Sequence, residues 1–537
     1  MNIGIAQINT TVGAIEDNTE KILEVYHRLQ SQCDLILLPE LSLCGYPPRD
    51  LLLRRSFLEQ AKKAIDDIAQ QTLDTALLVG FPESTSGGKL YNALAFCHQG
   101  KVKRIARKTL LPSYDVFDED RYFSPASEVT VLSFCGYRIG ITICEDLWNQ
   151  GSNHRCSHYD RNPVADISAH SLDLLLNAAA SPWHVGKNRE RLALLREAAG
   201  TCGCPVVYVN AIGGNDELIF DGGSTVVNAS GKMVWEAPSF VEAFHCWDTG
   251  SKKIEINSPM PELLQIESAL VLGLRDYARK SGFSKIILGL SGGIDSALTA
   301  YLAVQALGKE NVQGISLPSA ISSQHSKEDA QSLAINLGIR FSTIPINGIF
   351  SEFRKSLNPL FSKLPEDVTE ENLQSRSRGV ILMAIANKTG ALLLTTGNKS
   401  ELAVGYCTLY GDLCGGLAVI ADVPKTTVFA LSKFINRERE IIPWNTIKKP
   451  PSAELKPGQE DLDSLPPYED LDAILKAYVE ENQSLEEITA LGYSTEVVEE
   501  ILKKVDRNDH KRNQAPPVLK ISPLAFGVGR RFPIVKP

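Results

Sequence analysis

The sequence predicts an α/β protein of at least two domains: a layered sandwich, then a parallel sheet with helices on both faces. Its 537 residues exceed what one hydrophobic core usually supports. Strand-like apolar runs alternate with helical patterns in both halves, and a polar, turn-rich segment at 248–261 separates the halves. Hydrophobic residues make up 43% of the chain and charged residues 22%, as in soluble globular proteins.

The first half contains seven strand-like runs and several helical patterns. Several of these strands are separated only by short turns, so a layered sandwich fits better than a simple doubly wound sheet. The predicted strands are 3–8, 35–38, 76–80, 138–143, 172–177, 205–210 and 224–228, and the predicted helices include 18–32, 57–71 and 188–200.

The second half alternates more regularly, which is typical of a parallel sheet covered by helices on both faces. The stretch 448–467 is rich in proline and charge, and we expect a mobile surface loop there. The predicted strands are 286–290, 312–317, 340–346 and 391–395, and the predicted helices are 263–280, 296–307, 326–337, 468–481 and 484–505.

Charge and cysteine content narrow the class of protein. The net charge of −9 argues against nucleic acid as a bulk electrostatic partner. No apolar stretch is long enough to cross a membrane, and the first residues do not resemble a signal peptide. Eleven cysteines scattered among strand-like segments indicate reduced thiols, with the Cys202/Cys204 pair expected to serve packing. We therefore expect a cytoplasmic enzyme.

A phosphate-binding loop is predicted directly after the strand 286–290. The sequence there is Ser-Gly-Gly-Ile-Asp-Ser over 291–296, followed by an alanine-rich helical stretch. Adjacent glycines let backbone N–H groups approach anionic oxygens, and a helix N-terminus adds positive potential. Asp295 and Ser296 stand where the Walker pattern needs Lys and Ser or Thr. A carboxylate beside phosphates requires a cation between them, so Mg²⁺ is expected.

This loop resembles that of the PP-loop ATP pyrophosphatases, which cleave ATP between the α and β phosphates. The resemblance implies that the enzyme adenylylates a carboxylate or similar oxygen. A nitrogen nucleophile then displaces AMP from the activated oxygen.

Three residues of the first half suggest a second kind of chemistry. Glu40 follows the apolar run 35–38, and Lys108 leads into a turn with proline and aromatic residues. Cys144 stands where a strand ends abruptly, a position that can hold a nucleophile clear of its own sheet. A free cysteine is mostly protonated at neutral pH, so it needs a base to act as a nucleophile.

Glu40 in LPE, Lys108 in RKTLLP and Cys144 in CED resemble, in order and spacing, the motifs of the nitrilase superfamily. The resemblance implies an αββα sandwich and amide hydrolysis. Glu40 would be the general base, and Cys144 would attack the amide carbon to give a thioester. Lys108 would stabilise the oxyanion.

The resemblance also implies that the amide is glutamine, held by Tyr114, Ser181 and Lys187. A lysine suits a carboxylate, and a phenol suits a hydrogen bond. A helix N-cap for Ser181 and core packing for Tyr114 are the alternative interpretations.

Four further segments carry polar residues close to predicted strand ends or near the C-terminus. Ligands gather at the carboxyl ends of parallel strands, which makes these residues binding candidates. Asp422 could equally be a helix cap. The segments are ENLQSRSRG with Asn372, Arg376 and Arg378; LLLTTGNKSEL with Thr396 and Glu401; YGDLCGGLAVIADVPKT with Asp422 and Lys425; and DHKRNQAPP with Lys511 and Arg512.

With the loop at 291–296, these segments resemble the NAD synthetases, and the nitrilase-like half narrows this to the glutamine-dependent NAD synthetases over essentially the whole chain. The resemblance implies that ATP adenylylates nicotinic acid adenine dinucleotide (deamido-NAD) and that ammonia from glutamine then displaces AMP to give NAD. It implies domains at 1–247 and 262–537 with a linker at 248–261, and a homo-oligomer, at least a dimer, formed through the synthetase half. The residues carried over are Gly289, Leu290, Ser291, Gly292, Gly293, Ile294, Asp295, Ser296 and Thr396 for ATP; Asn372, Glu401 and Lys511 for deamido-NAD; and Asp295 and Glu401 for Mg²⁺. Lys425 would face phosphate.

Two other functions stay open. One is a PP-loop amidotransferase with a different acceptor, as in GMP or asparagine synthesis, although the glutaminase halves of those enzymes are of other types. The other is a catalytically silent scaffold, against which the intact Glu40, Lys108 and Cys144 argue.

Overall fold

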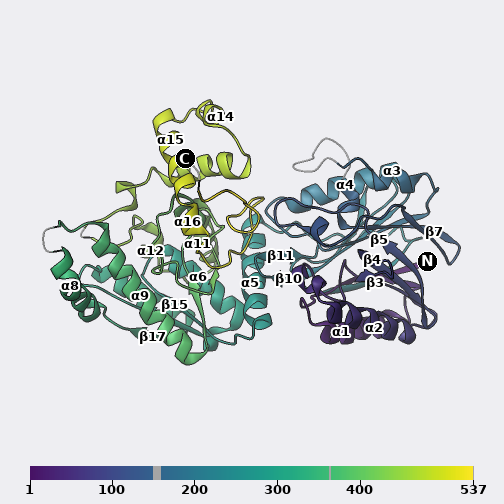
Figure 1. Ribbon diagram of the computed structural model, residues 1–537, viewed down its shortest axis with the longest axis horizontal. Helices are drawn as coiled ribbons and strands as arrows, with labels where there is room; N and C mark the ends of the chain where they lie inside the picture. The colour runs from purple at the N-terminus through teal and green to yellow at the C-terminus, as the bar shows by residue number, and fades with distance from the viewer. Residues whose placement is uncertain (149–158, 362–363, 457, 536–537) are drawn as a thin grey trace. The chain divides into compact units, whose positions relative to one another are not determined.

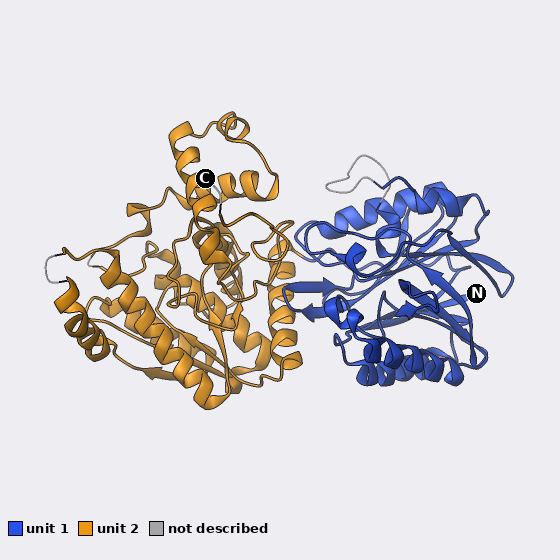
Figure 2. Ribbon diagram, in the orientation of Figure 1, with its two compact units in different colours: residues 1–260 blue, residues 261–537 orange. Residues whose placement is uncertain are grey.

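The chain forms two compact units, Met1–Met260 and Pro261–Pro537 (Figure 2). The computed structural model describes residues 1–148, 159–361, 364–456 and 458–535. The division falls at the end of the polar segment 248–261. In the described part of the chain, no helix has the length and apolar character needed to span a bilayer.

Unit 1 contains two six-stranded sheets and a hairpin. The first sheet has the order β14-β1-β2-β3-β4-β5 and the second β13-β12-β9-β8-β7-β6. Strands β1, β2 and β3 are parallel to one another, as are β7, β8 and β9, and the outer pairs are antiparallel. The strands are β1 (Asn2–Gln7), β2 (Leu35–Leu37), β3 (Ala76–Ser84), β4 (Leu90–His98), β5 (Lys101–Arg107), β6 (Thr130–Phe134), β7 (Tyr137–Ile143), β8 (Leu174–Ala179), β9 (Val206–Asn210), β10 (Ile212–Asn215), β11 (Leu218–Asp221), β12 (Thr225–Val227), β13 (Met233–Glu236) and β14 (Ala243–Asp248).

Two helical layers enclose these sheets, giving the αββα sandwich that the nitrilase resemblance implied. Helices α1 (Ile15–Leu29) and α2 (Arg55–Gln71) lie on the outer face of the first sheet, and α3 (Pro163–Ser168) and α4 (Lys187–Cys202) on that of the second (Figure 1). Leu35 and Leu37 join one core cluster with residues of the second sheet, while Ile36 joins another with residues of α1 and α2. This alternation explains why β2 is apolar at every position.

Unit 2 is built on a five-stranded sheet of order β17-β16-β15-β18-β19 whose pairs are all parallel, as predicted. Its strands are β15 (Ile286–Gly289), β16 (Val312–Ser316), β17 (Arg340–Thr343), β18 (Leu392–Thr395) and β19 (Leu417–Ala418). Its α-helices are α5 (Glu262–Lys280), α6 (Ile294–Leu307), α7 (Gln324–Leu337), α8 (Asn347–Phe361), α9 (Val368–Thr389), α10 (Lys399–Val404), α11 (Lys425–Ile435), α12 (Trp444–Lys448), α13 (Tyr468–Leu475), α14 (Leu485–Thr489), α15 (Thr495–Arg507) and α16 (Asp509–Arg512).

Some helices and strands differ in extent from those predicted from the sequence. The helix predicted at 484–505 is two helices, because the chain turns between them at Gly492, which has a φ of 105°. The strand predicted at 340–346 ends at Thr343. In unit 1 the prediction missed strands β4, β5, β6, β10, β11, β13 and β14. Of these, β5 is an edge strand with mostly basic, exposed side chains, so its apolar signal is weak.

The stretch 448–467 is irregular, as predicted, but parts of it pack tightly. Asp461 is buried and accepts a hydrogen bond of 2.7 Å from the Tyr468 hydroxyl. The backbone oxygen of Leu455 accepts another from the Gln374 side chain, at 3.0 Å. The stretch is therefore an irregular segment with many exposed residues that is held by contacts at Leu455 and Asp461.

Candidate active sites

A buried lysine lies between two carboxylates in unit 1. The Lys108 ammonium donates to Glu40 Oε1 and to Glu119 Oε1, each at 2.7 Å, and the lysine and Glu40 side chains are fully buried. Burial alone would lower the pKa of Lys108, but the two carboxylates outweigh it and raise the pKa well above its usual value. Lys108 is therefore a permanent cation in an enclosed site.

Glu40 is held by the backbone around it. It follows β2, and the next residue lies so close to β3 that a Cβ on Gly80 would come within 2.2 Å of the Leu41 nitrogen. Glu40 Oε1 also accepts from the Asn92 side chain at 2.7 Å, and Oε2 accepts from the Ala180 N–H at 2.9 Å. Donors from three separate segments thus fix this carboxylate.

Cys144 begins the turn that follows β7 and has a φ of 42°, a strained value for a residue with a side chain. Asp146 holds this turn, because its carboxylate accepts from the N–H groups of Ile143, Thr109 and Leu110, each at 2.9 Å. The same contacts join the Cys144 turn to the segment just after Lys108.

The electrostatics around Cys144 define what this site can do. Burial raises the pKa of the Cys144 thiol well above its usual value; the nearby Glu40 carboxylate adds to the rise and Lys108 opposes it. The resting thiol is therefore protonated and needs a base. Burial also raises the pKa of Glu119, to about 7. A thiol, a carboxylate and a cation thus lie together in a dry site, which suits nucleophilic attack on a carbonyl.

Two of the three predicted glutamine contacts surround a second buried carboxylate. The Tyr114 hydroxyl donates to the Glu145 carboxylate at 3.1 Å, and the Tyr159 hydroxyl donates to it at 3.0 Å. Lys187 lies 3.7 Å from the centre of the Trp148 ring, and burial lowers its pKa to about 8. Lys187 and Glu145 are also close enough to influence each other's charge.

Ser181 is buried and follows β8. Its N–H donates to Asn210 Oδ1 at 2.9 Å, and its hydroxyl accepts from Arg191 Nε at 3.4 Å. Arg191 is itself buried and paired with Asp221 at 2.6 Å. These contacts fix the position of Ser181, and the N-cap role considered from the sequence does not apply, because α4 begins at Lys187.

The predicted phosphate loop of unit 2 lies between β15 and α6. Gly292 has a φ of 81°, and a Cβ there would come within 2.2 Å of the Ser326 backbone oxygen, so only glycine fits. The Ser291 hydroxyl accepts from the Gly293 N–H at 3.1 Å, and the Ser296 hydroxyl donates to the Gly293 oxygen at 3.0 Å. The turn is thus tight and held by its own serines.

A second lysine between two carboxylates lies beside this loop. The Lys425 ammonium is 2.6 Å from Asp295 Oδ2 and 3.2 Å from Glu401 Oε1. The Asn398 side chain donates to Asp295 Oδ1 at 2.9 Å. Burial raises the pKa of Glu401 to about 8; Lys425 opposes the rise and Asp295 adds to it. Asp295 and Glu401 therefore repel each other unless a cation lies between them.

This donor set fits Mg²⁺. The ion is usually bound by one or two carboxylates, with substrate phosphates and water as its other ligands. The described residues contain no group of three or more His, Cys, Asp or Glu side chains arranged to hold a metal, so Asp295 and Glu401 would need such additional ligands.

The other binding residues predicted in unit 2 make separate contacts and do not form one cluster with Asp295, Lys425 and Glu401. Thr396 follows β18 and is half-buried. Asn372 lies on α9 and accepts from the Thr408 hydroxyl at 3.0 Å. The Lys511 ammonium donates to the backbone oxygens of Gly405, at 2.7 Å, and Cys407, at 2.9 Å.

Asp422 is fully buried and accepts from the N–H groups of Ile521 and Ser522, each at 2.7 Å, and from Lys399 at 3.0 Å. It anchors the C-terminal segment. This contact set supports neither the ligand nor the helix-cap interpretation considered from the sequence.

Sequence reasoning missed several residues that meet the predicted ones. Asp146 and Glu145 directly follow Cys144, so their position in the CED motif could have drawn attention to them. Glu119 had no such signal, because Asp118 and Asp120 flank it and nothing local distinguishes the three.

Comparison with known proteins assigns a family to each unit. A carbon-nitrogen hydrolase family profile matches residues 2–244, and an NAD synthase profile matches residues 266–515. The chain is 50% identical to the glutamine-dependent NAD(+) synthetase of Synechocystis sp. over 99% of this chain and 98% of that protein. It is 44% identical to the enzyme of the same name from Acinetobacter baylyi, again over 99% and 98%.

Solved structures show the same relationship. A glutamine-dependent NAD+ synthetase from Acinetobacter baumannii, in complex with adenosine diphosphate, superposes with a TM-score of 0.79 at 41% identity, covering 99% of this chain and 98% of that one. The enzyme from Cytophaga hutchinsonii shares the fold, with a TM-score of 0.85 at 22% identity, covering 100% and 98%. With identities of this size over nearly the full length, the chain belongs to the glutamine-dependent NAD(+) synthetases, a family of ligases.

Proposed function

We propose that this enzyme makes NAD from deamido-NAD, ATP, glutamine and water, and releases AMP, pyrophosphate and glutamate. Unit 1 would hydrolyse glutamine, and unit 2 would activate and amidate the pyridine carboxylate. The observation that carries the proposal is that one chain combines the Glu40–Lys108–Cys144 cluster with a glycine loop beside Asp295, Lys425 and Glu401.

In unit 1, Glu40 takes the proton of the Cys144 thiol as the sulfur attacks the side-chain amide carbon of glutamine. The carbonyl oxygen gains negative charge in this step, and the adjacent Lys108 cation stabilises it. Glu40 then gives the proton to the leaving nitrogen, ammonia departs, and a thioester remains. Water, deprotonated by Glu40, hydrolyses the thioester and restores the thiol.

We further propose that Tyr114, Ser181 and Lys187 hold glutamine. Lys187 and Glu145 provide opposite charges for the carboxylate and ammonium groups of an amino acid, which supports this assignment. Tyr114 donates to Glu145 and so fixes the position of that carboxylate. The buried Arg191 behind Ser181 keeps the serine in place.

In unit 2, the segment Gly289–Ser296 would surround the phosphates of ATP, and Thr396 would contact the nucleotide. Asp295 and Glu401 would hold Mg²⁺, which neutralises phosphate charge when bound. Lys425 would stabilise charge on the phosphoryl oxygens as the pyridine carboxylate attacks the α-phosphorus. Ammonia then attacks the activated carboxyl carbon and AMP leaves.

Asn372, Glu401 and Lys511 would bind deamido-NAD, and a second copy of the chain would complete the assembly through unit 2. An exposed apolar face on α8 supports a dimer. Ile349, Phe353 and Leu360 on that helix are 43%, 40% and 76% exposed. Exposed apolar side chains of this size, gathered on one helix, are typical of protein interfaces.

The test is NAD formation from ATP and deamido-NAD with glutamine or ammonium chloride as the nitrogen source. Cys144→Ala should lose glutamine-driven synthesis by about 10³-fold or more, since the nucleophile is gone. It should keep ammonia-driven synthesis at alkaline pH, where neutral NH₃ is abundant. Cys135→Ala, which changes an exposed cysteine of the same unit, is the matched control. Loss of both routes in Cys144→Ala would disprove the two-site scheme.

A further inference from the structure

Two cysteines far apart in the sequence meet on the outer face of the first sheet in unit 1. The Cys33 thiol donates to Cys246 Sγ at 2.9 Å, across 213 positions of the chain. Cys33 is buried and follows α1, whereas Cys246 lies on β14 and is half-buried. The mechanism proposed above uses neither residue.

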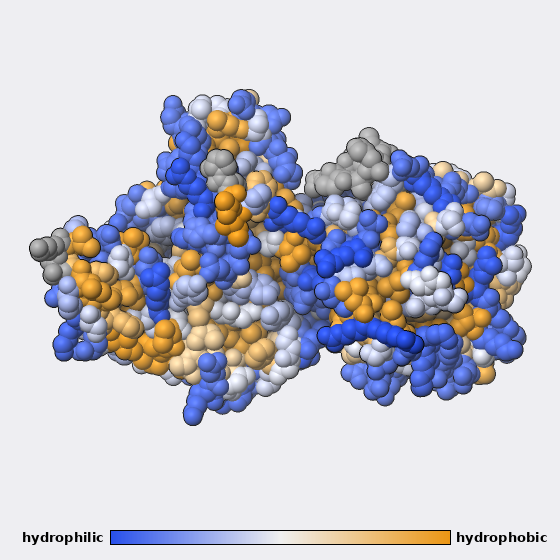
Figure 3. Space-filling view, viewed as in Figure 1, coloured by the Kyte–Doolittle hydropathy of each residue, from blue (hydrophilic) through white to orange (hydrophobic). Residues whose placement is uncertain are grey.

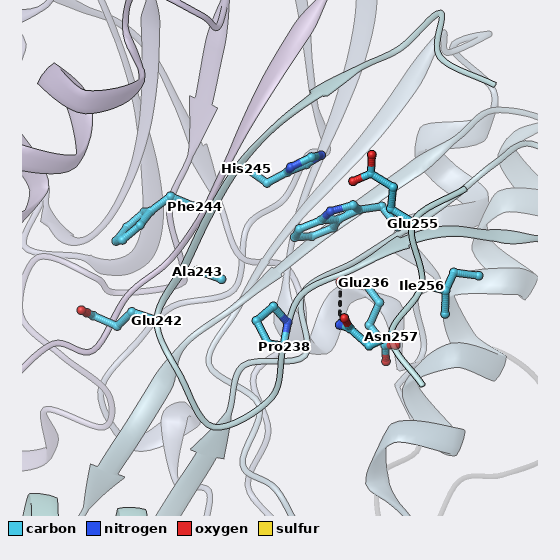
Figure 4. A pocket seen from close by; sticks show the side chains of 10 residues that line it. Glu236, Pro238, Glu242, Ala243, Phe244, His245, Glu255, Ile256 and Asn257 are labelled. Carbon is cyan, nitrogen blue, oxygen red and sulfur yellow. Dashed lines mark hydrogen bonds between the residues drawn. The ribbon is translucent and has the colours of Figure 1, made fainter. Parts of the chain in front are cut away.

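The strand geometry explains how the two sulfurs meet. Successive side chains of β14 point to opposite faces of the sheet, so Cys246 shares a face with Phe244. The side chains of Phe244 and His245 point to opposite sides of β14 (Figure 4), and the His245 ring stacks on Trp235. Arg28 of α1 lies 4.7 Å from the centre of the Phe244 ring. Cys246 therefore faces the layer of α1, which ends just before Cys33.

A glycine between the two cysteines leaves the space that they occupy. Gly4 on β1 pairs with Cys246 on β14, and a Cβ on Gly4 would lie 3.1 Å from Cys33 Sγ. Because residue 4 has no side chain, no atom separates the two sulfurs above β1. The same packing cluster contains both cysteines.

We propose that Cys33 and Cys246 are an oxidant-sensitive pair that forms a reversible disulfide when the enzyme meets a peroxide. The bridge would join the turn after α1 to β14, the last strand of unit 1. The sulfurs already lie closer than two unbonded sulfur atoms normally approach, so bond formation needs only a small movement.

The reaction balances with hydrogen peroxide as the oxidant. The Cys246 thiolate attacks one peroxide oxygen, the O–O bond breaks, and the products are a sulfenic acid and hydroxide. The Cys33 sulfur then attacks the Cys246 sulfur, the S–O bond breaks, and the oxygen leaves as water with the Cys33 proton. Two thiols are oxidised to one disulfide, and one peroxide is reduced to two waters. A small thiol reverses the bridge by exchange.

The surroundings of the two cysteines determine which of them reacts first with the oxidant. Cys246 is the more exposed of the pair, so an oxidant in solvent reaches it first. Burial raises the pKa of the Cys246 thiol, but the hydrogen bond from Cys33 opposes that rise. Burial and the same hydrogen bond both raise the pKa of Cys33. Cys246 thus ionises more easily and reacts first, with Cys33 as the resolving thiol.

Peptide mapping of the full chain tests the proposal. The reduced enzyme is treated with a small excess of hydrogen peroxide, alkylated without reductant and digested with trypsin. We expect a cross-linked species that joins peptide 29–49, which carries Cys33 and Cys44, to peptide 233–252, which carries Cys246. Fragmentation between Cys33 and Cys44 should assign the bond to Cys33, and dithiothreitol should remove it.

Cys33→Ser and Cys246→Ser should each abolish the cross-link, while Cys135→Ser should retain it. Exposed Cys135 also shows that enough oxidant is present, because its wild-type peptide should be oxidised. If Cys135 is oxidised while peptides 29–49 and 233–252 stay separate, the proposal is wrong. The proposal is also wrong if the disulfide uses Cys44 in place of Cys33. It is equally wrong if the only disulfide found joins Cys202 to Cys204. The wild-type map decides the question even if a serine variant fails to fold.

Discussion

Each unit of this enzyme places a buried lysine between two carboxylates, yet the two sites differ in how open those carboxylates are. Around Lys108, the Glu40 and Glu119 side chains are 0% and 6% exposed, and Asn92 donates to both. Around Lys425, the Asp295 and Glu401 side chains are 17% and 18% exposed. The same three charges are thus enclosed in one unit and accessible in the other.

This difference matches the two kinds of chemistry proposed for the units. A carboxylate whose oxygens are held by protein donors in a dry site is suited to moving one proton on and off a thiol. A carboxylate pair that remains accessible can share a cation with an incoming polyphosphate. The lysine is needed in both, because two carboxylates this close repel each other. In the proposed scheme, the access to the carboxylates distinguishes the function of one site from that of the other.

The largest expected effect comes from removing the lysine of the open site. Lys425→Met should lower both glutamine-driven and ammonia-driven NAD synthesis by about 10³-fold, because phosphoryl charge loses its nearest fixed cation. Glutamine hydrolysis, measured as glutamate release, should persist. Lys433→Met, an exposed position on the same helix, is the control. Ammonia-driven synthesis at the wild-type rate would contradict the role given to Lys425.

Glu119→Gln tests the closed site. It should lower glutaminase activity by about 10²-fold, since Lys108 loses one of its two anions, and leave ammonia-driven synthesis unchanged. Burial raises the pKa of Glu119 to about 7, so wild-type glutaminase activity should rise as the pH increases through 7 and the carboxylate ionises. The variant should lack that rise. Glu128→Gln, at an exposed position, is the control and should behave as the wild type. If Glu119→Gln keeps the wild-type pH profile, Glu119 has no role in the mechanism.

Lys187→Met should raise the KM for glutamine about 10-fold, because one charge-assisted contact is lost. Burial lowers the pKa of Lys187 to about 8, so the wild-type KM should also rise as the pH increases through 8 and the ammonium loses its proton. Lys187→Arg keeps its charge at that pH and should show no such rise. The KM is measured from initial rates at varied glutamine concentration between pH 7 and 9. A wild-type KM that does not change with pH would argue against a contact between Lys187 and glutamine.

The smallest effect concerns the Cys144 turn. Asp146→Asn should destabilise unit 1 by about 1–3 kcal/mol, because an amide can present only one oxygen to the three backbone N–H groups that Asp146 now serves. Urea unfolding followed by tryptophan fluorescence measures it, since Trp444 is the only tryptophan outside unit 1. Asp120→Asn, at an exposed position, is the control.

The wild type should also show a pH dependence at Asp146. Burial raises the pKa of Asp146 to about 6, so the folded state binds this proton more tightly than the unfolded chain does. Its contribution to stability should therefore be greatest at low pH and be lost as the pH rises through 6. Asp146→Asn removes this contribution, and an unchanged slope in the variant would show that Asp146 does not titrate in this range.

The sequence was most informative where a function depends on local backbone geometry. Gly292 must be glycine because its φ is positive and Ser326 lies against it, and Cys144 stands at the abrupt end of a strand. Such requirements appear as short motifs, and the motifs indicated both the predicted phosphate loop and the proposed nucleophile. The regular alternation of strand-like and helical segments also predicted the parallel sheet of unit 2.

Which residues contact those motif residues could not be predicted from the sequence, because the contacts depend on the topology of the fold. Lys425 is 130 positions from Asp295, and the two meet because β19, the strand before Lys425, pairs with β18, which pairs with β15. Glu119 has acidic neighbours on both sides, yet it alone of the three is buried and reaches Lys108. Cys33 and Cys246 meet because β14 returns to pair with β1.

By itself, the sequence determined the two-part α/β architecture, the order of the reactive residues and the loops that carry them, because each depends on short-range backbone constraints. Only the tertiary structure decided which charges are buried together, which carboxylates stay accessible and which cysteines touch. Those properties arise from strand order and layer packing, and the residues involved lie too far apart in the chain to leave a local pattern.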